Sequence, residues 1–212
     1  KNSCEMIFIS PDKAANPISI LGYTKKVAEK VCENFNENIN NKKKIKIVRF
    51  GNVFGSSGSA INNFLNKINN EKTIEITSKK ATRYFMTALE ACHLVLQTTT
   101  INSKGCIFIL NMGKPINILE LAKNLGKIKM KLNNNYIFKY KETGLKPGEK
   151  LNETLKDDRE ILRKISNEIF MVYNKKSNIR KFEVYFEKLK DNFLRSKKVG
   201  VIKALKNIIK FC

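Results

Sequence analysis

The chain has 212 residues, of which 42% are hydrophobic and 28% are charged. This length suits one domain or one and a half, and this composition excludes global disorder. No apolar run approaches the ~18 residues that a membrane-spanning helix requires. The chain carries 41 Lys and Arg against 19 Asp and Glu, which gives a formal net charge of +22.

That positive charge suits nucleic acid, an anionic membrane surface or an anionic small substrate as a partner. Only six of the basic residues are Arg, and aromatic residues are not interleaved with them. Nucleic-acid surfaces usually use Arg to read base edges and aromatic side chains to stack on bases. We therefore interpret the charge as compositional drift and predict no nucleic-acid partner, while a basic nucleic-acid-binding protein stays the weaker alternative.

The cysteines and the histidine predict neither a metal site nor a catalytic triad. The five cysteines are far apart, with no C-x-x-C pair, and their odd number argues against a disulfide framework. We expect most of them to be buried small hydrophobic residues in a reducing cytoplasm. His93 lies in a helical run, where a lone histidine more often packs or faces solvent than acts as a catalyst.

The first elements follow the order strand, helix, strand. Residues 6–10 are a short apolar run typical of a buried parallel strand, residues 20–36 have helical periodicity, and residues 46–50 indicate the next strand. This order predicts a right-handed crossover in an α/β sheet. The apolar side chains expected on one face of the helix are Val27, Val31 and Phe35.

Helices and strands are expected to alternate through the middle of the chain. The expected helices cover residues 60–68, 88–98 (capped by Thr87) and 116–127. The expected strands cover residues 73–77, 106–111 and 136–140. From about residue 156 the chain becomes charged and helix-like, with no Pro and a single Gly. The pattern predicts half of a doubly wound α/β domain, a small α+β lobe and a helical extension.

Two charged residues follow the first strand. Asp12 and Lys13 stand where ligands bind in parallel sheets, outside the carboxyl end of a strand. An adjacent carboxyl and amine can act as acid and base. The alternative is an exposed loop with two solvated charges, and the dipeptide alone favours that alternative.

A longer pattern favours the acid–base interpretation over the exposed loop. Five stretches carry it, in the order residues 8–17 followed by 21–30, then 49–59, 82–87, 110–115 and 144–151. Together they closely resemble the CapD-like nucleotide-sugar 4,6-dehydratases of polysaccharide biosynthesis, which are extended short-chain dehydrogenases/reductases acting on UDP-N-acetylglucosamine. The resemblance covers residues 6–155, and five ordered stretches are far more specific than any one of them.

The resemblance implies an organisation in three parts. Residues 1–55 would be the C-terminal half of a Rossmann-type dinucleotide-binding domain, residues 56–155 a substrate-binding lobe interleaved with the last Rossmann elements, and residues 156–212 a basic helical extension. The family uses NAD or NADP, but no G-x-G-x-x-G turn for the pyrophosphate occurs in these residues. We therefore expect the chain to be the C-terminal portion of a longer enzyme, whose cofactor half lies upstream of Lys1.

The resemblance also implies the roles of three catalytic residues. In such enzymes NAD(P)+ takes a hydride from C4 of the sugar, water leaves across C5 and C6, and the hydride returns to C6. Lys13 would be the base at C5, and Asp12 the acid that assists departure of the C6 hydroxyl. Lys25 would hydrogen-bond the nicotinamide ribose, which makes it both catalytic and cofactor-binding.

Three further residues would contact the UDP-sugar substrate. By the same resemblance, Asn52 would face the diphosphate, and Arg83 and Lys146 would contact the diphosphate or the uridine. Lys146 is a departure, because the family usually has Arg there, and Arg forms a bidentate fork where Lys is a point charge. Without the surrounding motif, Arg83 would be interpreted as a surface residue.

Other departures leave two further hypotheses open. Leu21 stands where the family has Tyr or Met, Pro11 replaces a Thr that precedes the Asp-Lys pair, and Lys80 replaces an Asp. Pro has neither a hydroxyl nor an N–H, so C4 oxidation lacks an obvious base. One alternative is a degenerate, non-catalytic member that binds a nucleotide sugar, and the other is a UDP-hexosamine 4-epimerase.

The resemblance also implies the cellular setting. A UDP-sugar substrate, a homo-oligomer and a role in capsule or lipopolysaccharide synthesis are expected. The expected location is the cytoplasm, with the inner face of the membrane as an alternative, because relatives often follow membrane-spanning N-terminal segments.

Overall fold

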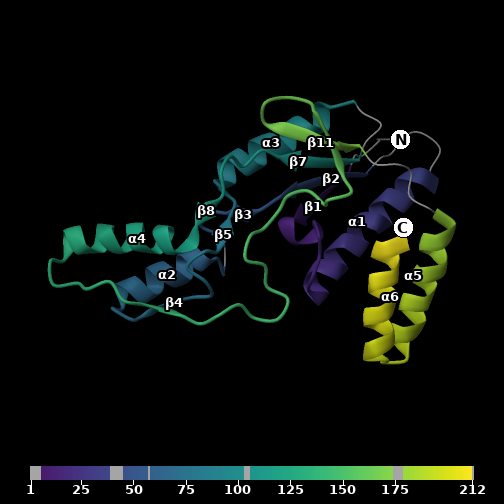
Figure 1. Ribbon diagram of the computed structural model, residues 1–212. Coiled ribbons are helices and arrows are strands. Elements are labelled where there is room, and N and C mark those ends of the chain that lie inside the picture. The colour runs from purple at the N-terminus through teal and green to yellow at the C-terminus, as the bar shows by residue number, and fades with distance from the viewer. Residues whose placement is uncertain (1–5, 39–44, 57, 103–105, 174–178, 212) are drawn as a thin grey trace. The chain divides into compact units, whose positions relative to one another are not determined.

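The computed structural model describes residues 6–38, 45–56, 58–102, 106–173 and 179–211 (Figure 1). The chain divides into two compact units, each of which is described by itself. Unit 1 contains Lys1–Phe50, Leu94–Asn111 and Thr154–Cys212. Unit 2 contains Gly51–His93 and Met112–Glu153.

Unit 1 is built on a five-stranded sheet. Its strands, in spatial order, are β1 (Met6–Pro11), β2 (Ile45–Phe50), β7 (Ile107–Leu110), β11 (Ile169–Tyr173) and β10 (Ile161–Lys164). The first three strands are parallel, whereas β11 runs antiparallel to β7, and β10 antiparallel to β11. The predicted α/β fold and its strands near residues 6, 46 and 106 are therefore confirmed.

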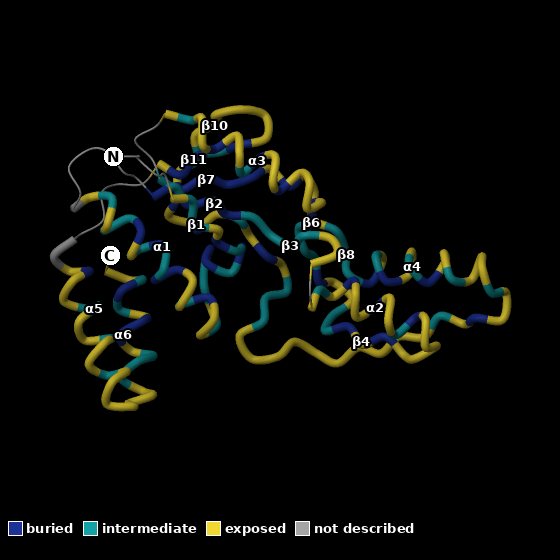
Figure 2. The backbone as a smooth tube through the Cα atoms, turned by 180° about the vertical axis from the view of Figure 1, so that it is seen from behind, coloured by how far each residue is buried: buried dark blue, intermediate teal, exposed yellow. Residues whose placement is uncertain are grey.

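The crossover between β1 and β2 is the helix α1 (Ile20–Asn38). A short 3-10 turn, η1 (Asp12–Ala14), separates β1 from this helix. The helix covers β1 and β2, and Cys32 on the helix joins strand residues such as Ile47 in one apolar cluster. Figure 2 shows β2 and β7 as mostly buried strands, which follows from their place in the middle of the sheet.

The helical prediction for residues 156–212 is wrong in its first part. Residues 161–173 form the β10–β11 hairpin, and helices begin only with α5 (Ile179–Leu194) and α6 (Lys198–Phe211). The apolar run of β11 pairs with β7, so tertiary pairing decides its conformation. Ser166 closes the turn, because its hydroxyl accepts the Ile169 N–H at 3.1 Å.

The two C-terminal helices form an antiparallel pair that packs on α1 (Figure 1). Val27 of α1, Phe182 of α5 and Leu205 and Ile208 of α6 share a buried cluster. The helical C-terminal extension is thus confirmed from residue 179 onward and belongs to unit 1. Among the described residues, no helix has the length and apolarity needed to span a bilayer.

Unit 2 combines short two-stranded pairs with helices. The parallel pairs are β3 (Asn52–Val53) with β6 (Phe85–Met86) and β4 (Ile74–Ile76) with β9 (Tyr140–Glu142). The antiparallel pair is β5 (Thr82–Arg83) with β8 (Ile116–Asn117). The helices are α2 (Ala60–Asn69), α4 (Ile118–Leu132) and the start of α3 (Ala88–Thr100), which ends in unit 1.

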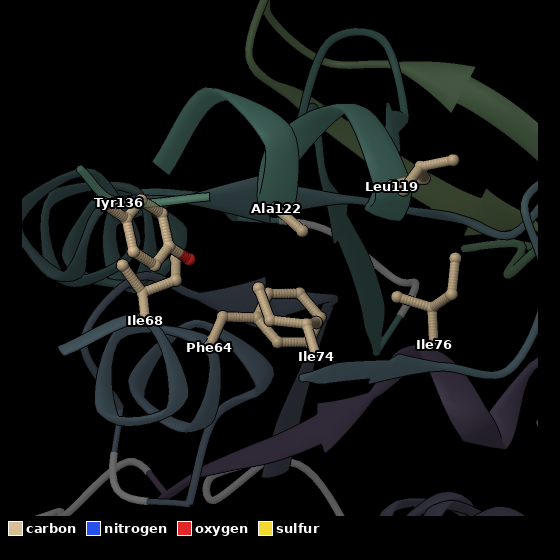
Figure 3. Packing of buried hydrophobic residues seen from close by; sticks show 7 residues of the cluster. All are labelled: Phe64, Ile68, Ile74, Ile76, Leu119, Ala122 and Tyr136. Atoms are coloured by element: carbon tan, nitrogen blue, oxygen red, sulfur yellow. The ribbon is translucent and has the colours of Figure 1, made fainter. Parts of the chain in front are cut away.

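The core of unit 2 lies between α2, α4 and β4 (Figure 3). Its buried members are Phe64, Ile68, Ile74, Ile76, Leu119, Ala122 and Tyr136. The strand expected over residues 136–140 begins only at Tyr140, which pairs with Ile74, while Tyr136 instead fills this core from a loop. The apolar pattern at the start of this stretch therefore reflects the burial of the Tyr136 side chain in the core and not a strand.

Candidate functional site

Asp12 and Lys13 lie immediately after β1, in the turn η1. The Asp12 side chain is almost fully buried (the residue is 1% exposed), and the Lys13 Nζ lies 3.3 Å from Asp12 Oδ1. Within the described residues the other carboxylate oxygen, Oδ2, has no hydrogen-bond partner. Because buried polar atoms are nearly always paired, this oxygen is a candidate for contact with a ligand.

The turn is held by close packing against the start of α1. A Cβ added at Gly22 would lie 2.8 Å from the Lys13 carbonyl oxygen and 3.0 Å from the Pro17 Cβ, so only glycine fits without a shift of the backbone. Ser19 caps this end, because its hydroxyl accepts the Gly22 N–H at 3.0 Å. The helix start and the Asp-Lys turn are therefore one rigid piece of unit 1.

The two adjacent lysines of α1 have opposite environments. Lys25, the residue predicted to meet a cofactor ribose, is exposed. Lys26 is buried, and its Nζ lies 3.0 Å from Glu160 Oε1 and 3.5 Å from Glu29 Oε2. The exposed side chain of Lys25 is thus accessible to a ligand. The side chain of Lys26 instead forms ion pairs in the interior of unit 1.

Lys26 belongs to a buried charge cluster that the sequence patterns did not predict. Arg49 of β2 forms a bidentate pair with Glu29, with Nε–Oε1 at 3.0 Å and Nη2–Oε2 at 2.7 Å. It forms a second pair with Glu160, with Nη1–Oε2 at 2.7 Å and Nη2–Oε1 at 3.0 Å. The Ser10 hydroxyl donates to Glu29 at 2.6 Å, which ties β1 to the cluster. A charged residue inside an apolar strand run, Arg49, is the local signal of a buried charge, but it does not identify the partners.

Mutual attraction keeps these groups ionised. Burial alone would lower the pKa of Arg49, but the charges and hydrogen bonds of Glu29 and Glu160 raise it above its usual range. Burial would likewise raise the pKa of Glu160, but Arg49 and Lys26 lower it from 4.5 to about 2. The cluster therefore fixes β1, β2 and α1, the elements that carry the Asp12–Lys13 turn.

In unit 2, Arg83 binds backbone carbonyls of the loop that follows Lys146. Its Nη1 donates to Leu151 O at 2.9 Å, and its Nη2 donates to Lys150 O at 2.9 Å. Its Nη2 also lies 3.7 Å from Glu149 Oε1. In this arrangement Arg83 positions the loop, which leaves fewer of its N–H groups for a substrate than sequence analysis expected.

Lys146 lies in a tight turn with its side chain exposed. The Glu149 N–H donates to Lys146 O at 2.9 Å, and Glu149 Oε2 accepts the Lys146 N–H at 3.2 Å. Gly148 has a φ of 82°, which favours glycine at this position of a Pro-Gly turn. Glu149 therefore connects Lys146 to Arg83.

Asn52 also contributes to the local backbone. Its Nδ2 donates to Tyr84 O at 3.0 Å, beside the β3–β6 pairing, and the side chain is half-buried. One amide hydrogen is thus used, and the other amide hydrogen and the amide oxygen are the groups with which it could contact a substrate.

The predicted site residues therefore fall into two sets. Asp12, Lys13 and Lys25 belong to unit 1, and Asp12 and Lys13 are in direct contact. Asn52, Arg83 and Lys146 belong to unit 2, and Arg83 and Lys146 are linked through Glu149. Their catalytic and binding roles remain predictions.

Comparison with known proteins identifies relatives of the chain. A family model described as "Polysaccharide biosynthesis protein" matches residues 1–175. The capsular polysaccharide biosynthesis protein CapD of Staphylococcus aureus is 43% identical over 157 residues, which are 74% of this chain and 26% of that protein. A UDP-glucose 4-epimerase of Rickettsia bellii is 33% identical over 159 residues, which are 74% of this chain and 45% of that protein.

A solved structure agrees with the fold. The X-ray structure of Pen from Bacillus thuringiensis superimposes with a TM-score of 0.71 at 30% identity, over 80% of this chain and 52% of that one. The chain thus spans about a quarter of CapD and about half of the Pen chain. The resemblance proposed from the five ordered stretches is confirmed at the level of the family. The chain belongs to the polysaccharide biosynthesis protein family and is CapD-like.

Proposed function

We propose that the protein containing this chain removes water from a UDP-N-acetylhexosamine such as UDP-N-acetylglucosamine, to give a 4-keto-6-deoxy sugar nucleotide for a surface polysaccharide. The observation that carries this proposal is the Asp12–Lys13 pair at the carboxyl end of β1. It has one carboxylate oxygen bound to the amine and the other without a partner in the described residues. A dehydration needs this combination, because one group must accept a carbon-bound proton and another must protonate the leaving hydroxyl.

The proposed roles follow from the atoms that each group offers. Lys13 takes the C5 proton, and Asp12, through Oδ2, gives a proton to the C6 hydroxyl, which leaves as water while C5 and C6 become doubly bonded. NAD or NADP, when bound, would supply the hydride chemistry that the reaction needs at C4 and C6. The amine of Lys13, protonated in the elimination and in exchange with solvent, then gives a proton back to C5 as C6 gains its hydride. The exposed ammonium of Lys25 is the group of this chain that would hold a ribose hydroxyl of that cofactor.

The cofactor half would come from polypeptide outside these 212 residues. Two observations support this part of the proposal. β1 forms an edge of the sheet, and its side chains Met6 and Ile9 are exposed, so another element could pair with it and cover them. The chain also spans only part of its relatives, whose remaining length could contain the cofactor cradle.

Substrate recognition is proposed to rest on unit 2. Lys146 offers an exposed ammonium to the diphosphate, and Asn52 offers its remaining amide hydrogen. Arg83 contributes by holding the backbone carbonyls of Lys150 and Leu151 and through any N–H that the loop leaves unused.

A direct test uses the longest natural polypeptide that contains this chain. Incubation with UDP-N-acetylglucosamine in D2O should give a product that has lost one water and carries deuterium at C5, measured by mass spectrometry and NMR. The variants Asp12→Asn and Lys13→Ala should each lower the rate of water loss by about 10²- to 10⁴-fold. The control is Asp158→Asn, an exposed residue whose replacement still accepts the bond from Asn16.

Two other outcomes would identify the alternatives. A product of unchanged mass without deuterium, formed equally by Asp12→Asn, would establish a 4-epimerase, which the likeness to the Rickettsia bellii protein favours as the second candidate. UDP-N-acetylglucosamine binding without any product would establish a non-catalytic sugar-nucleotide binder, as expected if Pro11 and Leu21 leave C4 oxidation without a base.

A further inference from the structure

The end of the α5–α6 helix pair is a tight, well-defined turn. We call residues 193–199 the hairpin tip. Ser196 has a φ of 53°, and the Lys197 N–H donates to Asn192 O at 2.9 Å. A Cβ added at Gly200 would collide with the Asn192 side chain, so the two helices approach closely at this end. The hairpin tip is therefore a compact structure that can present side chains in fixed positions.

Three large apolar side chains of the hairpin tip are exposed. Phe193, Leu194 and Val199 are 72%, 81% and 82% exposed. They are not part of the packing between the helices and α1, which Phe182 and Ile208 provide in the buried cluster. Figure 2 shows this end of the helix pair as exposed chain. Phe193 and Leu194 end α5, and Val199 lies in the first turn of α6. Exposed apolar side chains that gather at the adjoining ends of two helices indicate an interaction site.

Basic residues surround these apolar side chains. Residues 190–203 contain five basic residues and a single acidic one, Asp191. Asp191 is paired with Arg195, at 2.7 Å between Oδ1 and Nε. The side chains of Lys197, Lys198 and Lys203 are exposed. The hairpin tip thus joins an apolar end to an excess of positive charge within a few residues.

We propose that the hairpin tip docks on an anionic lipid bilayer. Phe193, Leu194 and Val199 enter the boundary between headgroups and acyl chains, and the neighbouring lysines contact headgroup phosphates. Such a surface matches both the exposed apolar side chains and the excess of positive charge.

The charges disfavour other occupants of this surface. A second copy of the same tip would bring an equal positive charge into contact with the first. Nucleic acid would match the lysines but would leave two aliphatic side chains in water, because Leu and Val offer no ring on which bases stack. The inference is independent of the proposed enzyme activity, since the hairpin lies beyond residue 175, where the family match ends.

The absence of Trp from the sequence gives a clean probe of insertion. Phe193→Trp places a single Trp at the hairpin tip. With vesicles of phosphatidylcholine and phosphatidylglycerol, its fluorescence should shift to shorter wavelength and be quenched by brominated acyl chains. Vesicles of phosphatidylcholine alone should give little change, and added salt should weaken binding. Vesicle binding without a shift or quenching would overturn insertion of the tip.

Double variants distinguish the apolar contribution to vesicle binding from the electrostatic contribution, with binding measured by co-sedimentation. Leu194→Ser with Val199→Ser should weaken binding about tenfold or more, and Lys197→Glu with Lys198→Glu at least about 20-fold. The matched control is Leu89→Ser, because Leu89 is 81% exposed and lies in unit 2 beside Glu90. Circular dichroism checks that each variant retains its helices.

The remaining outcomes contradict the proposal. Equal binding by the Ser variant and the parent chain would mean that adsorption is purely electrostatic and that the apolar side chains of the hairpin tip do not enter the bilayer. Loss of binding in Leu89→Ser alone would assign the contact to another surface. Concentration-dependent self-association that the Ser variant abolishes, without vesicle binding by the parent chain, would make a second copy the occupant.

Discussion

Arg49 is the residue on which the interior of unit 1 most depends. It is completely buried and donates hydrogen bonds to the carboxylate oxygens of Glu29 on α1 and Glu160 before β10. Burying these charges is costly, and the paired geometry offsets that cost. The cluster therefore adds specificity of packing, because only one arrangement of β2, α1 and the segment before β10 satisfies all of its members.

We expect Arg49→Met to destabilise unit 1 by about 3–5 kcal/mol, because it leaves two buried carboxylates without their main partner. Urea unfolding followed by circular dichroism measures this change. Arg163→Met is the control, since Arg163 is exposed on β10 and should change stability by less than about 0.5 kcal/mol. Equal effects of the two substitutions would contradict the importance given to the cluster.

The cysteines give a second prediction at this scale. Burial raises the pKa of the Cys32 thiol to about 11 and that of Cys106 to about 12, whereas Cys92 is exposed. Near neutral pH, alkylation should be slower than that of an ordinary thiol by roughly a hundredfold for Cys32 and roughly a thousandfold for Cys106, in proportion to the thiolate fraction. Peptide mass mapping after iodoacetamide treatment distinguishes the sites, and rapid labelling of Cys32 in the folded chain would show that the core is open. Cys4 and Cys212 lie outside the described residues.

At the scale of the element, α3 begins with the capping interaction that the sequence predicts at Thr87. The Thr87 hydroxyl accepts the Glu90 N–H at 3.1 Å, and the Glu90 carboxylate accepts the Thr87 N–H at 2.7 Å. The Thr87 N–H, and the Thr87 hydroxyl that donates to the same carboxylate at 2.8 Å, lower the pKa of Glu90 below its usual value. The pair satisfies two N–H groups that the first turn of a helix otherwise leaves free.

Thr87→Ala should therefore cost about 1 kcal/mol of stability in thermal or urea unfolding. Thr99→Ala is a suitable comparison on the same helix, because the Thr99 hydroxyl donates to the carbonyl of Leu96 in the last turns and caps no helix N-terminus. We expect it to change stability by less than about 0.5 kcal/mol. A larger loss at Thr99 than at Thr87 would refute the capping explanation.

The face of α1 was predicted only in part. Val27 is buried as expected, but Val31 and Phe35 are exposed, and Lys26 and Glu29 are buried instead. Apolar periodicity places the helix with its most hydrophobic stripe inward. Here Glu29 pairs with the buried Arg49 of β2, so the helix face that carries Glu29 lies against the sheet.

For the whole molecule, acid should weaken unit 1 before it weakens unit 2. The pKa of Glu160 is about 2 in the folded chain, against an ordinary value of 4.5. Between these values the unfolded chain binds the proton more readily, so the stability present at neutral pH is lost as pH falls through this range. The loss from this carboxyl alone is of the order of 3 kcal/mol.

Hydrogen exchange followed by mass spectrometry at pH values from about 6 down to about 3 tests this expectation. The amides of β2 and β7 should lose protection on acidification, and those of β4 in the apolar core of unit 2 should change less. Glu160→Gln should lower stability at neutral pH and flatten the acid dependence, whereas Glu168→Gln, at an exposed position, should leave it unchanged. A parallel loss of protection in both units would contradict the assignment to Glu160.

Local patterns were sufficient for much of this protein. The strand, helix and strand of the first fifty residues, the cap at Thr87 and the family resemblance of residues 6–155 could all be derived from the sequence, because each depends on neighbouring residues or on ordered motifs. The position of Asp12 and Lys13 after a strand was also correct. The catalytic role of the pair remains a prediction.

Tertiary structure alone decided the features that depend on partners distant in sequence. Ile169–Tyr173 is a strand because β7 offers it an edge, and Tyr136 is buried without a strand because α2 and α4 leave a space for its ring. Glu29, Arg49 and Glu160 are distant along the chain, so no local periodicity could show that they share one buried network. A buried charge needs a partner of opposite charge. Only the folded chain brings together partners that are distant in sequence.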